Sequence, residues 1–191
     1  MARRNDGRRA ALIDAPIEVL AAVGARGLTF RAVDARAAVP TGTASNYVAN
    51  RDDLLTQAGA RVHERLQPDE ATLAGQRAQA PDRETYAALM RELVGRISAF
   101  RTGCLALLEL RLEATRRPGL RAVLSGRVRA DVKADVAHHA ASGLPGDATG
   151  VRLLHLALNW LIVEQLTPPD MFTEAQRERL VTAAVERLVR P

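Results

Sequence analysis

Residues 37–48 read AAVPTGTASNYV, a stretch that separates two short helical segments by a tight turn. The apolar and polar spacing predicts one short helix at residues 31–38 and another at residues 42–48, with Pro40 in the turn between them. The apolar side that packs this pair together is supplied by Val33, Ala37 and Val39. A pair of short helices around a tight turn therefore decides how the N-terminal part of the chain folds.

Turn and cap signals divide the rest of the chain into further helical stretches. We expect these helices at about residues 8–25, 51–66, 82–100, 101–117, 120–141, 147–166 and 174–189. Candidate N-caps precede several of them, and Thr173 and Gln176 form the pattern of a capping box. Residues 67–81 are polar, and we expect them to form a hinge or a loosely ordered connection. The sequence predicts an all-α fold of about nine helices without strands.

The composition supports this fold class and restricts the partners. Hydrophobic residues make up 47% of the 191 positions, which excludes a disordered chain, and aromatic residues make up only 3%. The net charge is +5, and residues 1–51 hold eight arginines against four acidic residues. Such a basic end favours contact with a polyanion, either nucleic acid or acidic lipid. The alternative is that a local excess of basic residues has no function, since it is common in arginine-rich sequences. The scarcity of aromatic side chains favours duplex over single-stranded DNA.

The same residues bear on the cellular compartment. Cys104 is the single cysteine, so no disulfide can form within the chain, which fits a reducing compartment. The most apolar stretch, residues 153–163, is far shorter than the ~20 residues of a membrane span. Because the N-terminus also lacks the apolar run of a signal peptide, we expect a cytoplasmic protein with no membrane partner.

A short polar second helix after a tight turn, in a basic region, is the pattern of a helix-turn-helix. Such a helix must have a polar outer face to enter the major groove of DNA, about 12 Å wide. Thr43, Asn46 and Asn50 are spaced to share one face of a helix. Their small hydroxyl and amide groups can reach phosphates or base edges, so this segment is a candidate for contact with duplex DNA.

Three segments resemble, in order and spacing, the DNA-binding domain of TetR-type transcriptional regulators: GLTFRAV at 27–33, AAVPTGTASNYV at 37–48 and NRDDLL at 50–55. The resemblance covers about residues 8–66. It implies a helix-turn-helix DNA-binding domain at residues 1–66, followed by a helical effector-binding and dimerisation domain at residues 67–191. The implied function is that of a sequence-specific regulator of transcription, a ligand-responsive repressor that binds a palindromic operator as a homodimer.

The resemblance also assigns residues to DNA contacts. Residues 31–38 are similar to the supporting helix, and residues 41–48 are similar to the recognition helix. The implied contacts are Thr29, Arg31, Thr41, Thr43, Ser45, Asn46, Tyr47 and Arg51. Of these, Tyr47 and Arg51 match positions that meet backbone phosphates. Ala38 stands where the family usually has a turn glycine, and a left-handed backbone there costs ~1 kcal/mol.

In the C-terminal part, the family holds a small-molecule effector between helices that correspond to residues 82–166. The expected lining of that site is Leu89, Leu93, Cys104, Leu108, Glu109, His155, Asn159 and Trp160. Glu109 fits either a salt-bridged helix edge or a carboxylate that faces a cavity, and the polar groups at 155–160 need partners that are internal or belong to a ligand. The resemblance places the homodimer contact on helices 147–166 and 174–189.

An enzyme is the main alternative class. The sequence has no glycine-rich phosphate loop and no Cys/His metal spacing, and its four histidines form no familiar ligand pattern. We therefore expect no catalytic residues, no cofactor and no metal. The other alternative is a helical adaptor or membrane-surface protein that uses its basic end, which would bind anions weakly and without sequence preference.

Overall fold

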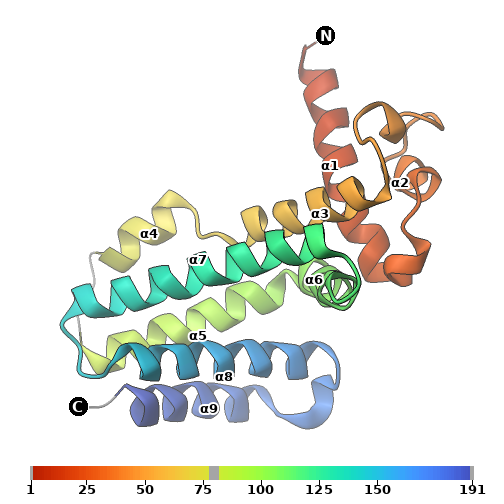
Figure 1. Cartoon of the computed structure of the whole chain (residues 1–191). Helices are drawn as coiled ribbons and strands as arrows, with labels where there is room; N and C mark the ends of the chain where they lie inside the picture. Colours follow the sequence, from red (N-terminus) through yellow and green to blue (C-terminus); the bar gives the residue numbers. More distant parts are fainter. Residues whose placement is uncertain (1, 78–81, 190–191) are drawn as a thin grey trace. The chain divides into compact units, whose positions relative to one another are not determined.

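The computed structural model describes residues 2–77 and 82–189, and within these ranges it contains helices and no strand (Figure 1). The α-helices are α1 (Ala2–Gly27), α2 (Phe30–Arg36), α3 (Arg51–Leu66), α4 (Glu70–Arg77), α5 (Arg83–Ala99), α6 (Arg101–Ala114), α7 (Pro118–Ser142), α8 (Ala148–Leu166) and α9 (Glu174–Leu188). Two short 3-10 helices, η1 (Ala44–Asn46) and η2 (Pro169–Met171), complete the described elements. The predicted all-α class is confirmed.

Side-chain caps explain where several helices begin. Asn50 accepts the N–H of Asp53 at the start of α3, and Asp147 accepts the N–H of Gly150 at the start of α8. Thr173 and Gln176 form the predicted capping box of α9, in which each side chain binds the other residue's backbone N–H. These caps satisfy N–H groups that have no partner within their helix, so the local sequence places the helix starts.

The chain forms two compact units. The first consists of residues 1–67 and 101–127, in which α1 packs against α2, α3 and α6. Its core includes Ile17, Leu55 and Leu110, none of which is exposed to solvent. The sequence placed all of residues 67–191 in a second domain, whereas α6 and the start of α7 cluster with the N-terminal helices. The reason is that α6 buries its apolar side chains on α1 and α3.

Helix α1 has one irregular residue, and it is not the proline. Pro16 lies inside α1 and is buried, and the backbone stays helical around it. The helix is interrupted at Gly24, where φ is 70° and ψ is 179°. This region of backbone conformation is essentially restricted to glycine. Gly24 therefore allows the chain to leave the axis of α1 before α2 begins.

The second unit consists of residues 68–100 and 128–191. Helices α5, α8 and α9 pack against one another in it, and Figure 1 shows α8 and α9 running nearly parallel with α5 oblique to them. Arg91 on α5 donates to Thr182 on α9 at 2.7 Å, and Ser98 on α5 donates to Gln165 on α8 at 3.0 Å.

The segment expected to be a hinge, residues 67–81, contains α4, while residues 78–81 of it lie outside the described residues. Helix α7 begins in the first unit and ends in the second, so this one helix contributes to both. In the part of the chain that the structure describes, no helix has the length and apolarity needed to cross a membrane.

Candidate nucleic-acid interface and effector site

A buried carboxylate holds the turn between α2 and α3. Asp34 on α2 is 2% exposed. One of its oxygens accepts the backbone N–H of Gly42 and the other accepts that of Ala44, each at 2.7 Å. A buried charge is costly unless hydrogen bonds compensate it, and bonds to a charged acceptor are the stronger kind. Asp34 therefore fixes the turn that leads into η1.

The backbone on either side of this turn is left-handed. Ala38 has a φ of 53° and Gly42 has a φ of 92°. The left-handed conformation considered for Ala38 is thus present, at a cost of ~1 kcal/mol that glycine at this position would avoid. Two backbone bonds flank this residue: the N–H of Ala38 donates to the carbonyl of Ala35, and the N–H of Val39 donates to the carbonyl of Asp34.

The predicted helix over residues 42–48 is wrong in its extent. The structure has a single 3-10 turn, η1, with Thr43 before it and Tyr47 after it. A helix cannot extend further on either side, because Gly42 has a positive φ and Asn50 has an extended backbone. The residues between them are mostly β-branched or short and polar, which are weak helix formers. Consequently the predicted shared face of Thr43, Asn46 and Asn50 does not form as a helical face.

The residues expected to contact DNA lie around this turn, and most are exposed. Tyr47 is 59% exposed, and Thr41, Ser45 and Asn46 are also exposed. The hydroxyls of Ser45 and Thr43 donate to the carbonyls of Gly42 and Pro40 within the turn. Their oxygens keep acceptor capacity, and the turn presents small polar groups next to an exposed aromatic ring.

Thr29 and Arg31 lie at the exposed start of α2. The hydroxyl oxygen of Thr29 accepts the N–H of Ala32 at 3.1 Å and caps the helix. A helix start of this kind directs its remaining N–H groups and its positive dipole end outward. The structure therefore brings these two residues to a helix end that is suited to an anion.

Arg51 is bound within the first unit. Its guanidinium donates from Nε to the carbonyl of Leu28 at 3.3 Å and from Nη2 to the carbonyl of Ala25. These bonds connect the start of α3 to the last turn of α1 and to the residue that follows it. A guanidinium has five N–H groups, so three remain for the phosphate contact expected from the sequence. That contact stays a prediction.

The residues expected to line an effector site are divided between the two units. Cys104, Leu108 and Glu109 belong to the first unit. The carboxylate of Glu109 accepts the backbone N–H of Ala25 at 2.9 Å, directly after the break at Gly24. Burial raises the pKa of the Cys104 thiol to about 11. The observed partner of Glu109 is thus a backbone N–H, which neither of the two sequence interpretations anticipated.

Glu113, one turn after Glu109 on α6, forms ion pairs with two arginines. Glu113 is buried, and its carboxylate oxygens lie 2.7 Å from Nη2 of Arg116 and 2.9 Å from Nε of Arg117. These hydrogen bonds, that of Arg117 first, lower the pKa of Glu113. Arg117 also bonds to Asp52 on α3. This network connects the end of α6 to the start of α3 within the first unit.

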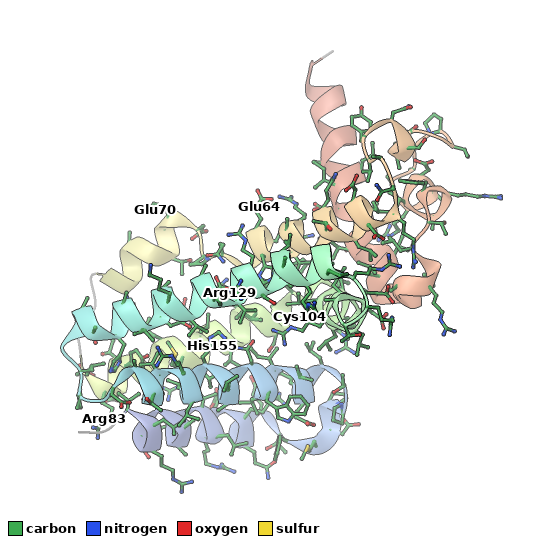
Figure 2. All side chains as sticks on the ribbon, in the orientation of Figure 1. Glu64, Glu70, Arg83, Cys104, Arg129 and His155 are labelled. Carbon is green, nitrogen blue, oxygen red and sulfur yellow. The ribbon has the colours of Figure 1, made fainter. Side chains whose placement is uncertain are left out.

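The other expected lining residues belong to the second unit. Leu89 and Leu93 on α5 and His155 and Asn159 on α8 are half-buried, whereas Trp160 is 62% exposed. Figure 2 shows His155 on the side of α8 that lies toward α5. Its Nδ1 lies 2.9 Å from the carboxylate of Asp135 on α7, and its carbonyl accepts the side-chain N–H of Asn159.

An aromatic pair that the sequence reasoning missed lies close to this histidine. Tyr86 on α5 and His139 on α7 are 6% and 3% exposed, with ring centroids 5.7 Å apart and planes at 65°. Burial and the negative charge of Asp135 raise the pKa of Tyr86. Neither ring nitrogen of His139 has a hydrogen-bond partner among the described residues. The sequence feature that could have indicated this pair is the spacing of His139, which places it on the same helix face as Val132 and Val136.

Asp34 was also missed as a functional candidate. The sequence feature that could have indicated Asp34 is an acidic residue directly after Val33 in a short helix, and both residues are buried in the structure. In the described ranges, His, Cys, Asp and Glu side chains form no group of three or more that could hold a metal ion.

Comparison with known proteins identifies relatives of this arrangement. The family described as tetracyclin repressor-like, C-terminal domain, matches residues 81–191. The chain is 29% identical to a TetR-family member from Streptomyces coelicolor A3, with a TM-score of 0.70 over 96% of this chain and 99% of that chain. A regulator of the same family from Mesorhizobium loti, 16% identical, shares the fold with a TM-score of 0.75 over 97% and 96% of the two chains. No curated protein sequence matches the chain.

A third relative has been crystallised with small molecules. The chain is 29% identical to the multidrug binding protein EbrR in its imidazole complex, with a TM-score of 0.66 over 96% of each chain. Structures of EbrR with proflavin and with ethidium also match, at 29% and 28% identity and TM-scores of 0.58 and 0.65. In both cases the match covers at least 95% of this chain and 99% of that chain.

Proposed function

The chain belongs to the tetracyclin repressor-like family of transcriptional regulators, and from this membership we propose that it represses transcription by binding a DNA operator that a small molecule makes it release. The observation that carries the proposal is the Asp34-held turn after α2, which presents Thr41, Asn46 and Tyr47 to solvent. A regulator of this kind acts in the cytoplasm on chromosomal DNA.

Within the DNA interface we assign two roles. Thr29 and Arg31 at the start of α2, with Tyr47 and Arg51, contact phosphates and set the position of the domain on the duplex. Thr41, Thr43, Ser45 and Asn46 reach base edges in the major groove, because they are small and carry hydroxyl or amide groups. Most of these side chains are exposed, which supports their availability for contact with DNA.

We further propose that the active form is a homodimer through α8 and α9. Leu153, Leu156 and Trp160 follow each other at helical spacing on α8 and are 47%, 63% and 62% exposed, and Leu180 on α9 is 42% exposed. An apolar stripe of this kind on a helix pair favours burial against a partner. A two-fold partner would place two recognition turns about one DNA turn apart, roughly 34–36 Å, on a palindromic operator.

The effector site of this proposal lies in the second unit, among α5, α7 and α8. The EbrR complexes with imidazole, proflavin and ethidium support a small-molecule ligand for a chain of this fold. Helix α7 is shared by the two units, and α6 is bonded to α1 through Glu109, while Arg117, which follows α6, bonds both to Glu113 of α6 and to Asp52 of α3. Ligand binding would favour a state in which these contacts hold the DNA-binding helices in an unproductive arrangement.

The test is the selection of bound sequences from random duplex DNA by the purified full chain. We expect enrichment of one site with two-fold symmetry. Arg31→Ala should then weaken binding to all sequences alike and reduce the salt dependence, whereas Asn46→Ala should change the preferred sequence. Absence of any enriched sequence would overturn the proposal and would favour weak, unspecific anion binding by the basic end.

A further inference from the structure

The backbone of Ala25 connects two charged side chains that come from distant parts of the first unit. Its N–H donates to Oε2 of Glu109 on α6 at 2.9 Å, and its carbonyl accepts from Nη2 of Arg51 at the start of α3. We propose that Glu109 is a positioning residue for DNA binding, which acts through Ala25 to hold the guanidinium of Arg51 for its contact with a phosphate. The inference rests on the proposed function, because that function assigns the phosphate contact to Arg51.

The break of α1 at Gly24 makes this connection possible. With φ at 70° and ψ at 179°, the backbone of Gly24 turns the following N–H out of the helical hydrogen-bond pattern. Ala25 is only 4% exposed, so water has little access to this N–H, and the carboxylate of Glu109 accepts it instead. A buried N–H without an acceptor is unfavourable, so the backbone at Ala25 would rearrange if Glu109 were lost.

Arg51 is bonded to the same stretch of backbone at two points. Its Nε donates to the carbonyl of Leu28 at 3.3 Å, and its Nη2 donates to the carbonyl of Ala25. The N–H of Leu28 also donates to the carbonyl of Ala25 at 3.2 Å, so residues 25–28 form a closed turn. Two bonds to one turn fix the plane of the guanidinium, because its N–H groups form a rigid fork. The orientation of Arg51 therefore depends on how this turn is held.

The turn at residues 25–28 adjoins the proposed DNA interface. Thr29, another proposed phosphate contact, directly follows Leu28, and Arg51 directly follows Asn50, the N-cap of α3. Within the described part of the chain, the guanidinium of Arg51 is bonded only to the two carbonyls of this turn. Three of its five N–H groups are therefore left for phosphate oxygens.

Preorganisation and charge make opposite predictions for Glu109. A free arginine loses conformational entropy when a complex orders it, whereas an arginine that is already held has lost most of it during folding. Loss of the bond from Glu109 should therefore weaken DNA binding. Its carboxylate, however, has the same sign of charge as DNA, so removal of the charge alone should strengthen binding. A pair of variants that share the loss of charge separates the two effects.

Glu109→Ala and Glu109→Gln form this pair, because only the glutamine keeps an acceptor for the N–H of Ala25. The probe is a fluorescently labelled duplex of about 25 bp and mixed sequence at low salt, since phosphate contacts do not depend on sequence. Anisotropy is measured at a temperature where circular dichroism shows all variants to be folded. We expect Glu109→Ala to bind roughly three- to tenfold more weakly than Glu109→Gln. Equal affinities of the two variants would overturn the inference.

The same pair in an Arg51→Ala background separates positioning from a general effect on the domain. Arg51→Ala alone should weaken binding and reduce the salt dependence by about one phosphate contact. In this background the two Glu109 variants should bind equally, because the side chain that Glu109 positions is absent. If their difference persists without Arg51, Glu109 does not act through Arg51 and the inference is wrong. It is also wrong if Arg51→Ala binds the duplex as wild type does.

Glu64 on α3 supplies the matched control. Its carboxylate lies 2.9 Å from Nη1 of Arg61 in the same unit, and its side chain is 66% exposed. Glu64→Ala and Glu64→Gln should bind the duplex equally, because neither alters the turn at residues 25–28. If Glu109→Ala does not fold, Glu109→Leu replaces it, since leucine lacks an acceptor but keeps a larger side chain on α6.

The outcome for wild type distinguishes this inference from the proposed function. If wild type binds the duplex and the two Glu109 variants bind equally, the positioning role is refuted while the proposed function stands. If wild type binds no duplex even at low salt, the proposed function is refuted and the inference with it.

Discussion

Glu109 on α6 accepts a hydrogen bond from the backbone N–H of Ala25 at 2.9 Å, across 84 positions of the chain. Ala25 directly follows the break of α1 at Gly24, where a helix N–H has lost its regular partner. A Cβ at Gly24 would lie 3.2 Å from Oε2 of Glu109, which shows how closely the carboxylate approaches the backbone. One side chain of α6 thus determines how α1 ends.

Glu109→Ala should lower the free energy of unfolding by about 1–3 kcal/mol, because it leaves the N–H of Ala25 without its acceptor. Glu109→Gln keeps an acceptor oxygen and should recover most of this loss. Urea unfolding followed by circular dichroism measures both. If Glu109→Ala is as stable as wild type, this hydrogen bond does not stabilise the end of α1.

Asp34→Ala should reduce operator affinity more than its loss of stability explains. The substitution removes the acceptor for two N–H groups and releases the turn before η1, at a cost of about 2–3 kcal/mol. Asp14→Asn is the matched control, because Asp14 pairs with Arg61 at 2.7 Å within the same unit. Affinity is measured by fluorescence anisotropy on the selected site, at a temperature where both variants are folded. Equal losses of affinity in the two variants would argue against a positioning role for Asp34.

The ion pairs of Glu113 should make stability depend on pH in the acidic range. Bonds from Arg117 and Arg116 lower the pKa of Glu113 in the folded protein, so its unfolded form binds a proton first as the pH falls. The stabilisation is present above the unfolded pKa of about 4.3 and is lost as the pH falls through the folded pKa. Glu113→Gln should be less stable than wild type at pH 7, and the difference should shrink below about pH 4. Denaturant midpoints between pH 3 and 7 would show a constant difference if the pair contributes nothing.

Cys104 should react slowly with iodoacetamide in the native protein. Burial raises its pKa to about 11, so very little of the reactive thiolate exists at neutral pH. The unfolded thiol ionises near pH 8.5, so this group contributes stability below that pH and loses it as the pH rises toward 11. Mass spectrometry should detect fast alkylation only after denaturation. Fast modification of the folded chain at pH 7 would contradict the burial of this thiol.

Trp160→Glu should convert the proposed homodimer into monomers. A buried tryptophan at the centre of an interface commonly contributes at least about 2 kcal/mol, and a carboxylate there adds a desolvation cost. Met171→Glu is the control, because Met171 is 57% exposed but belongs to η2 and not to the stripe of exposed side chains on α8. Analytical ultracentrifugation distinguishes the two species. If the Trp160 variant still forms dimers at micromolar concentration, the interface does not include Trp160 and lies on another surface.

Local sequence determined most helix starts, because a cap acts over three or four residues. Asn50, Asp147 and the pair Thr173 and Gln176 bind N–H groups in their own first turn, and all were recognisable from spacing alone. The turn at residues 37–48 was also recognisable from its own sequence, through Pro40 and the short polar residues around it. The short extent of η1 was not, because propensity alone does not show that Gly42 and Asn50 leave room for a single turn.

The tertiary structure decided which polar side chains have hydrogen-bond partners within the fold. Glu109 and Asp34 bind backbone N–H groups that no local pattern pairs with them, and Arg51 is bound to the carbonyls of Ala25 in α1 and of Leu28 after it. Tyr86 and His139 meet because α5 and α7 bring them together from distant positions. The sequence by itself therefore determined the all-helical class and the position of the turn, through short-range hydrogen bonds and periodicity. Burial and long-range partners depend on how helices pack, so only the folded chain assigns them.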